Sequence, residues 1–312
     1  MQKMSLQGSL ECHGLSASYG SLGQKKSSHE KSLLQNVSFS IKEGEFVCLC
    51  GPNGSGKSTL LSLLAGLPQP ALHVRAGSIK PDIRKLPRRQ TARFIAYLQQ
   101  SESCAWDFPV LDYVVQGRYA YAPGGNYSSA DYQLARDSLA LLEISNFEER
   151  TVHTLSGGEF QKVRIARALT QHPKFLLLDE PAASLDFVYE PRLMQLLRDL
   201  AHKEQIGMLV SVHDVNLAAS FADKMIMLCG TSSRREQAPA VTRPTPAGEL
   251  PGSVPAPAGE HPGSASSPGA PEAITPGALC GRPQEIMTKE NLEKIYGVPF
   301  ECKEKSFFQS SL

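Results

Sequence analysis

The feature that most constrains the fold of this 312-residue chain is the stretch GPNGSGKST at Gly51–Thr59. It lies between an apolar run, EFVCLC at Glu45–Cys50, and an apolar segment with helical spacing that continues to Leu67. The pattern G-x-x-x-x-G-K-[ST] in this context predicts a loop whose backbone N–H groups surround nucleotide phosphates at the positive end of a helix. We expect Lys57 to neutralise phosphate charge and the Ser58 hydroxyl to bind Mg²⁺. The predicted nucleotide-binding residues of this loop are Gly51, Pro52, Asn53, Gly54, Ser55, Gly56, Lys57, Ser58 and Thr59.

A second motif, FLLLDEP at Phe175–Pro181, is typical of a buried strand that ends in two acids. Phosphoryl transfer needs one carboxylate for the metal and one for the attacking water. We expect Asp179 to bind Mg²⁺ and Glu180 to polarise the water. Many strands end in acids, so this motif is informative only because the phosphate loop accompanies it.

The order of the remaining patterns predicts an α/β fold. Strands alternate with helices, which indicates a mostly parallel sheet covered on both faces. Short β segments are expected before the phosphate loop, within residues 10–47, and a hydrophilic loop at 21–31. Further strands are expected at 94–98, 175–178 and 208–212, and helices at 131–143, 158–169, 191–202 and 283–298, the last with a Thr288 cap.

Composition excludes several classes of protein. The length allows one core with an appended subdomain, or two small domains. The net charge is only +1 and no basic stripe is present, which argues against nucleic acid as a partner. No apolar run approaches the ~20 residues that cross a bilayer, and the start lacks the apolar centre of a signal peptide, so a cytosolic chain is expected. The seven cysteines show no CxxC spacing, which argues against a disulfide framework or zinc site.

Residues 231–277 differ in composition from the rest of the chain. They are rich in Pro, Ala, Gly, Ser and Thr and contain a degenerate repeat, PAGELPGSVPA followed by PAGEHPGSASS. Such a segment cannot bury enough apolar surface to offset its chain entropy, which predicts a disordered insert. The expected domain is therefore formed by residues 8–230 and 278–312.

The sequence LSGGE at Leu155–Glu159, followed by FQKVRIARAL, indicates the family. With this motif the chain resembles the ATP-binding cassette (ABC) ATPases over nearly its whole length outside the insert. The resemblance implies a RecA-like mixed-sheet core, an antiparallel β subdomain and a helical subdomain at about 101–167. It also implies a head-to-tail homodimer that ATP closes and hydrolysis opens. In that dimer Ser156, Gly157 and Gly158 of one protomer reach the γ-phosphate bound to the other, at the N-terminus of a helix.

Further roles follow from the same resemblance. Tyr19 is similar to the aromatic residue that stacks on adenine, although an ordinary strand tyrosine is the alternative. Gln100 resembles the glutamine that joins the metal and water shell and links the two subdomains. Its neighbour Gln99 is the less favoured alternative for that role.

Two loops complete the implied site. Asp186, in the segment ASLD at 183–186, resembles the carboxylate through which the two protomers sense each other's sites. His213, in SVHDVNLA, resembles the switch histidine that contacts the γ-phosphate and orients the water beside Glu180. The resemblance thus implies that Glu180, His213 and Gln100 are catalytic, and that Ser58, Gln100 and Asp179 bind the metal.

The finer resemblance is to ATPases of importers for iron–siderophore complexes, haem or cobalamin. It rests on VVQGRYAY at 114–121, SLDF at 184–187 and HDVNLAASFADKMIML at 213–228, together with the LSGGE segment. It implies a subunit at the cytoplasmic face of the inner membrane, working with separate permease subunits and a substrate-binding protein. The alternatives are a zinc or manganese importer ATPase and a soluble ABC ATPase of iron–sulfur assembly. For the permease we expect either a docking surface or internal packing at Trp106, Phe108, Val110 and Tyr113.

Overall fold

The computed structural model describes most of the predicted domain. The described residues are 8–19, 31–67, 69, 72–102, 106–183, 185, 188–229, 277–303 and 306–309. The predicted insert lies outside them except for Gly277, and so does the predicted loop except for Lys31, which begins a strand. Both therefore stay predictions.

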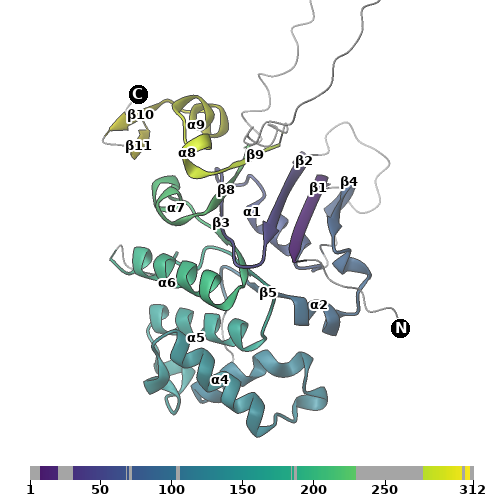
Figure 1. Cartoon of the computed structure of the whole chain (residues 1–312), viewed down its shortest axis with the longest axis vertical. Helices are drawn as coiled ribbons and strands as arrows, with labels where there is room; N and C mark the ends of the chain where they lie inside the picture. The colour runs from purple at the N-terminus through teal and green to yellow at the C-terminus, as the bar shows by residue number, and fades with distance from the viewer. Residues whose placement is uncertain are drawn as a thin grey trace, which may run out of the picture.

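A six-stranded sheet forms the centre of the molecule (Figure 1). Its strands are parallel except for the last, which runs antiparallel to its neighbour. This confirms the predicted mostly parallel sheet. In spatial order the strands are β5 (Ile95–Leu98), β6 (Phe175–Leu178), β7 (Gly207–Ser211), β3 (Phe46–Cys50), β8 (Lys224–Leu228) and β9 (Ala278–Gly281).

Both faces of this sheet are buried, which explains why its strands are continuous apolar runs. Successive side chains of a strand point to opposite faces. In β3, Cys48 and Cys50 therefore pack into one hydrophobic cluster, and Val47 and Leu49 into another. The phosphate loop starts directly after Cys50, so a strand buried on both faces holds the beginning of the loop.

A smaller antiparallel sheet lies beside the central one. Its strands, in spatial order, are β2 (Lys31–Lys42), β1 (Ser9–Tyr19) and β4 (Leu72–Lys80). Helix α1 (Lys57–Leu64) lies between the two sheets (Figure 1), and its leucines share a hydrophobic cluster with strands of both. The helix that follows the phosphate loop is therefore held on two sides.

Three helices cover the outer parts of the core, and the C-terminal residues pack against one of them. The three are α2 (Arg88–Phe94), α6 (Tyr189–Glu204) and α7 (Val215–Phe221). The C-terminal elements are α8 (Pro283–Ile286), α9 (Lys289–Tyr296), β10 (Phe300–Lys303) and β11 (Ser306–Gln309). The prediction of one helix over 283–298 is wrong because Met287 leaves the helical conformation, with φ −78° and ψ 69°. Thr288 caps the second helix instead, since its hydroxyl accepts from the Asn291 backbone N–H at 3.2 Å.

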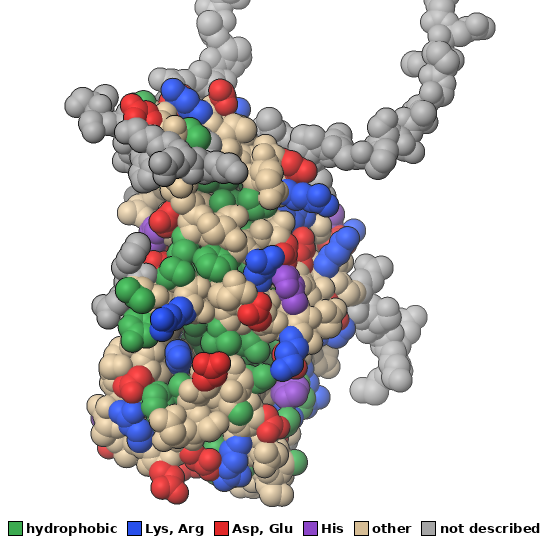
Figure 2. All heavy atoms as spheres, turned by 60° about the vertical axis from the view of Figure 1, so that its left-hand side comes forward, with side chains coloured by type: hydrophobic (Ala, Val, Ile, Leu, Met, Phe, Trp, Pro, Cys, Tyr) green, Lys and Arg blue, Asp and Glu red, His purple; other side chains and the backbone are tan. Residues whose placement is uncertain are grey.

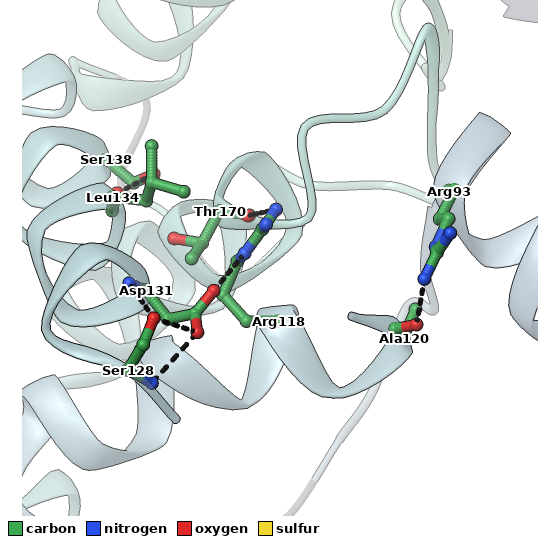
Figure 3. A network of polar contacts seen from close by, with 8 residues as sticks. All are labelled: Arg93, Arg118, Ala120, Ser128, Asp131, Leu134, Ser138 and Thr170. Carbon is green, nitrogen blue, oxygen red and sulfur yellow. Dashed lines mark hydrogen bonds and ion pairs between the residues drawn. The ribbon is translucent and has the colours of Figure 1, made fainter. Parts of the chain in front are cut away.

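A helical region forms the lower part of Figure 1. It contains α3 (Val110–Val115), the 3₁₀ helix η2 (Gln116–Ala120), α4 (Ser129–Leu141) and α5 (Gly157–Thr170). Arg118 of η2 joins α4 and α5, because its guanidinium donates to Asp131 Oδ1 at 2.9 Å and to the Thr170 carbonyl at 3.3 Å (Figure 3). Asp131 also completes a capping box with Ser128. Four shorter 3₁₀ helices complete the described elements: η1 (Ile83–Lys85), η3 (Pro123–Gly125), η4 (Ser145–Phe147) and η5 (Val152–Thr154).

The helical region meets the core through stacked arginines. The ring of Tyr121 contacts two guanidinium groups, with its centroid 3.7 Å from Arg118 Cζ and 4.6 Å from Arg93 Cζ. Arg93, on α2, also donates to the Ala120 carbonyl at 3.1 Å (Figure 3). Cation–π contacts and one hydrogen bond therefore connect α2 to η2.

The face shown in Figure 2 mixes acidic and basic side chains, and its hydrophobic side chains form several separate patches. No helix in the described part of the chain combines the length and the apolar character needed to cross a membrane.

Candidate active site

The phosphate loop has the backbone conformation that its glycines allow. Gly51 and Gly56 have φ values of 149° and 100°, which side-chain-bearing residues rarely adopt. A Cβ at Gly51 would also lie 2.7 Å from the Leu228 carbonyl oxygen. Lys57 folds back over the loop, and its Nζ donates to the Gly51 carbonyl at 2.8 Å. The loop is thus a closed turn around the lysine ammonium.

The electrostatics around Lys57 favour an anion. The side chain is buried, and burial lowers its pKa from the ordinary value, while the nearby carboxylates of Glu180 and Asp179 act in the opposite direction. A charge in such a poorly hydrated place interacts strongly with an opposite charge that reaches it. The two carbonyls that Lys57 contacts, at Gly51 and Pro52, only partly satisfy its three donors.

Two hydroxyls of the loop suit a phosphate and a metal. Ser55 Oγ is buried and has no hydrogen-bond partner among the described residues. Such a group usually has a partner, so a ligand oxygen is a natural one. Ser58 is exposed, and its hydroxyl is accessible. At the rim, the half-exposed Tyr19 at the end of β1 brings its hydroxyl within 3.5 Å of Thr59 Oγ1.

The two predicted acids lie at the end of β6 and share one serine hydroxyl. Ser211, the last residue of the neighbouring β7, donates to Asp179 Oδ1 at 2.7 Å. Its oxygen also accepts the backbone N–H of Glu180 at 2.7 Å. Tyr97 OH lies 3.5 Å from the other oxygen of Asp179. A buried carboxylate with these partners is fixed in position.

Glu180 is held between the other two predicted catalytic residues. Gln100 Nε2 donates to Glu180 Oε2 at 2.5 Å, and His213 Nε2 lies 2.5 Å from Glu180 Oε1. The neighbouring Gln99 is held by its backbone instead, because its carbonyl accepts from Arg164 Nη2 at 2.6 Å. The structure therefore brings Gln100, rather than Gln99, to the glutamate.

Glu180 also has an unusual backbone conformation. Its φ is 49°, in the left-handed region, although the residue is not glycine. Such strain is typical of functional sites and persists where the surrounding structure determines it. Here the Ser211 hydroxyl that accepts the Glu180 N–H supplies part of that constraint.

The LSGGE segment begins helix α5. Ser156 is its N-cap and forms a capping box with Glu159, in which the serine hydroxyl accepts at 3.3 Å and the glutamate accepts at 2.8 Å. Ser156 and Gly157 are exposed, and a Cβ at Gly157 would meet no atom within 4 Å. The capping box satisfies the N–H groups of Ser156 and Glu159, and the exposed Ser156 and Gly157 leave the start of the helix accessible to an outside ligand.

Two other predictions have different outcomes. Asp186 lies outside the described residues, so its role in sensing between the two protomers stays a prediction. Of the two alternatives for the apolar group at 106–113, internal packing holds for Val110 and Tyr113, which are 0% and 2% exposed and pack inside the helical region. Trp106 is 72% exposed, and Phe108 lines a groove of about 840 Å³ beside α3. The two buried side chains follow from helix periodicity, because they lie on the inner face of α3.

The sequence interpretation missed two residues of this site. Ser211 and Tyr97 both contact Asp179, but each belongs to an apolar strand and carries no motif of its own. Only strand order could have indicated them, because β5 and β7 are the neighbours of β6.

Comparison with known proteins agrees with this geometry. The family profile described as ABC transporter matches residues 34–183. The hemin import ATP-binding protein HmuV of Burkholderia thailandensis is 37% identical over 230 residues, which are 68% of this chain and 85% of that protein. The protein of the same name from Methylobacillus flagellatus is 36% identical over 207 residues, or 64% of this chain and 75% of that one.

Solved structures show the same fold. A metal-chelate type ABC transporter in an inward-facing conformation matches with a TM-score of 0.67 and 24% identity, covering 96% of this chain and 95% of that one. A dimeric structure of the ABC transporter cassette MJ0796 matches with a TM-score of 0.58 and 28% identity, covering 70% and 93%. From the site geometry, the profile and the long alignments to HmuV proteins, the chain belongs to the ABC transporter family, as one of its ATP-binding ATPases.

Proposed function

We propose that this ATPase hydrolyses MgATP at the site around Glu180 and thereby drives the import of an iron complex, such as haem or a siderophore complex, or of cobalamin. The observation that carries the proposal is the environment of Glu180, whose carboxylate is held by Gln100 and His213. Glu180 directly follows Asp179 in the chain, and its charge acts to raise the pKa of the phosphate-loop lysine, Lys57, against the effect of burial.

The residues present suit a Mg²⁺ ion. Magnesium prefers oxygen ligands and is commonly held by one or two carboxylates plus substrate phosphates. Asp179 and the exposed Ser58 hydroxyl supply oxygens of this type, and Gln100 can add an amide oxygen. When bound, the ion would neutralise charge on the phosphates.

The remaining residues would orient the reaction. Lys57 would donate to phosphate oxygens in place of the loop carbonyls that it contacts now. Glu180 would accept a proton from the attacking water, because each carboxylate oxygen has a second lone pair beyond those used by Gln100 and His213. Ser211 would keep Glu180 and Asp179 in a fixed relation while this happens.

The turn at Ser156–Gly158, whose first two residues are exposed, supports a head-to-tail homodimer. The turn opens helix α5, and the positive N-terminal end of a helix favours an anion. In the dimer it would meet the ATP bound to the phosphate loop of the partner. The dimeric MJ0796 cassette, 28% identical to this chain, provides a precedent for pairing in this family.

The HmuV relatives support the choice of cargo, since their name describes import of hemin. The cargo would pass through separate permease subunits, supplied by a substrate-binding protein. The ATPase would then act at the cytoplasmic face of the inner membrane. The exposed Trp106 and the groove beside Phe108 are the surfaces we propose for permease docking.

Replacing Glu180 by Gln tests the proposal. The variant should lose nearly all turnover but still bind ATP, because the phosphate loop is unchanged. It should also form a dimer in MgATP that size-exclusion chromatography with light scattering detects. Glu148→Gln is a matched control, because Glu148 is also paired, with Arg136 at 2.8 Å, but lies in the helical region. Turnover of the Glu180 variant within a few-fold of the control would refute the catalytic assignment.

The cargo needs a separate experiment. The chain should co-purify with polytopic membrane subunits, and the assembled complex should hydrolyse ATP faster when binding protein loaded with haem is added. Stimulation by zinc- or manganese-loaded binding protein alone would favour a metal importer. Co-purification with soluble proteins only would favour an assembly ATPase.

A further inference from the structure

The segment that follows β5 is fastened to helix α5 by a group of polar side chains, which we call the Glu102 cluster: Glu102, Arg164, Arg167 and Tyr113. Glu102 Oε2 accepts from Arg167 Nη2 at 2.7 Å and lies 3.5 Å from Arg164 Nε. Its other oxygen accepts from Tyr113 OH at 3.2 Å. The Arg167 guanidinium stacks over the Tyr113 ring, 4.6 Å from its centroid. One half-buried carboxylate thus joins three side chains from α3 and α5.

The second anchor of the segment is Arg164. This side chain is only 4% exposed. It donates to the Gln99 carbonyl at 2.6 Å and to Gln161 Oε1 at 2.6 Å. Its Nε is buried and has no hydrogen-bond partner in the described part of the chain. Glu102 is the nearest carboxylate to that nitrogen, so its negative charge is what compensates the buried guanidinium on this side.

These two anchors flank Gln100 on either side along the chain. Gln99 is held through its carbonyl, Glu102 is held through its carboxylate, and the Gln100 side chain between them donates to Glu180. Fixing the residues on both sides restricts the backbone that carries Gln100. We propose that Glu102 is a positioning residue, which holds Gln100 against Glu180 by fastening residues 99–102 to helix α5. The proposal rests on the proposed role of Gln100 at the ATPase site.

This arrangement also connects two functional parts of the molecule. Helix α5 begins with the Ser156 turn, and it carries the buried Arg164 and, in its last turn, the half-buried Arg167. A displacement of α5 relative to the central sheet would therefore act on residues 99–102 through these contacts. Gln100 would follow α5, whereas Glu180 would stay with β6 and Ser211. The contact between Gln100 and Glu180 then depends on where the helical region sits.

Glu102 is charged at neutral pH, so its charge can be removed by mutation to test the proposal. Burial acts to raise the pKa of Glu102, but the hydrogen bond and charge of Arg167 and the charge of Arg164 outweigh it and lower the pKa. Glu102→Gln keeps the size of the side chain and removes the charge. The control is Glu148→Gln, because Glu148 is paired with an arginine at 2.8 Å and is as exposed as Glu102, at 32% against 31%.

The experiment is a double-mutant cycle on the full chain, with ATPase kcat, ATP affinity and melting temperature measured for Glu102→Gln, Gln100→Ala, the double variant and the control. We expect kcat of Glu102→Gln to fall about tenfold, as for loss of a charged hydrogen bond, with ATP affinity unchanged. In the Gln100→Ala background the same change should have no further effect on kcat, because Glu102 acts through Gln100. The control should keep wild-type kcat.

Several outcomes would overturn the positioning role. The first is equal, additive losses of kcat in both backgrounds, which a merely structural effect of Glu102 produces. The second is wild-type kcat for Glu102→Gln, and the third is wild-type kcat for Gln100→Ala. None of these affects the ATPase assignment, which depends on Glu180→Gln and fails only if that variant keeps its turnover.

Discussion

Gly117 in η2 is the position where a single added methyl group should disturb the helical region most. A Cβ on this residue would point at the Arg167 carbonyl oxygen, far inside the 3.0 Å that Cβ atoms keep from other heavy atoms. It would also lie 3.2 Å from Thr170 Cβ. Both neighbours belong to α5, whose Thr170 is fully buried, so the helix cannot move away. We expect Gly117→Ala to displace η2 instead, by roughly 1 Å.

The size of the effect follows from what this displacement changes. Overpacking a well-packed region costs about 1–3 kcal/mol. The hydrogen bond from Arg118 to the Thr170 carbonyl is already 3.3 Å long and would be lost, at about 1 kcal/mol. The free energy of unfolding should therefore fall by about 2–4 kcal/mol. For a protein of this size the melting temperature should fall by about 5 °C or more.

The assay is thermal unfolding followed by circular dichroism, with Gly8→Ala as the matched control. A Cβ at Gly8 would meet only the end of the Glu43 side chain, at 3.8 Å, so this control should melt within about 1 °C of the wild type. ATP affinity should be unchanged in both variants. Equal melting temperatures for Gly117→Ala and Gly8→Ala would show that η2 does not pack against α5 as closely as described.

Two further predictions concern charge. Lys57→Ala should weaken ATP binding by at least tenfold in a titration with a fluorescent nucleotide, because it removes a buried ammonium from the phosphate loop; wild-type affinity would contradict the predicted phosphate contact. Asp131→Asn should lower the free energy of unfolding by about 1–2 kcal/mol at neutral pH, because the Arg118 hydrogen bond lowers the pKa of Asp131 from 3.8 to about 2. A carboxyl group whose pKa is lower in the folded state stabilises the fold at pH values above its unfolded-state pKa. The difference in the free energy of unfolding between wild type and Asp131→Asn should therefore shrink as the pH falls from 4 towards 2 in denaturant titrations. A difference that stays constant over this range would contradict the ion pair.

The sequence was sufficient for those parts of the site that are local in the chain. The phosphate loop needs glycines, a lysine and a hydroxyl within nine residues, so the residues that determine its geometry are all adjacent in the sequence. Asp179 and Glu180 end a buried apolar strand for the same reason. The parallel sheet was also predictable, because strands buried on both faces are continuous apolar runs, as in Phe175–Leu178.

Contacts between strands and the turns at helix ends were not predictable in this way. Ser211 contacts Asp179 because β7 pairs with β6, and the residues around Ser211 do not predict that pairing. The break at Met287 depends on backbone angles that the apolar spacing of 283–298 does not determine. Val110 and Tyr113 form an apolar group that suits either a docking surface or a core, and only the packing of α3 on α5 distinguishes the two.

The residues of the ATPase site are held by hydrogen-bond partners from two different parts of the protein. Glu180 and Asp179 are tied to the central sheet by Ser211, whereas Gln100 is tied to α5 through Arg164 and the Glu102 cluster. Ser156 and Gly157, at the start of the same helix, are exposed. A ligand that binds this exposed turn therefore acts on the helix that positions Gln100. Its effect on Glu180 is indirect and passes through Gln100. This geometry makes hydrolysis sensitive to the position of the helical region, which is the property an ATPase needs if a partner is to control it.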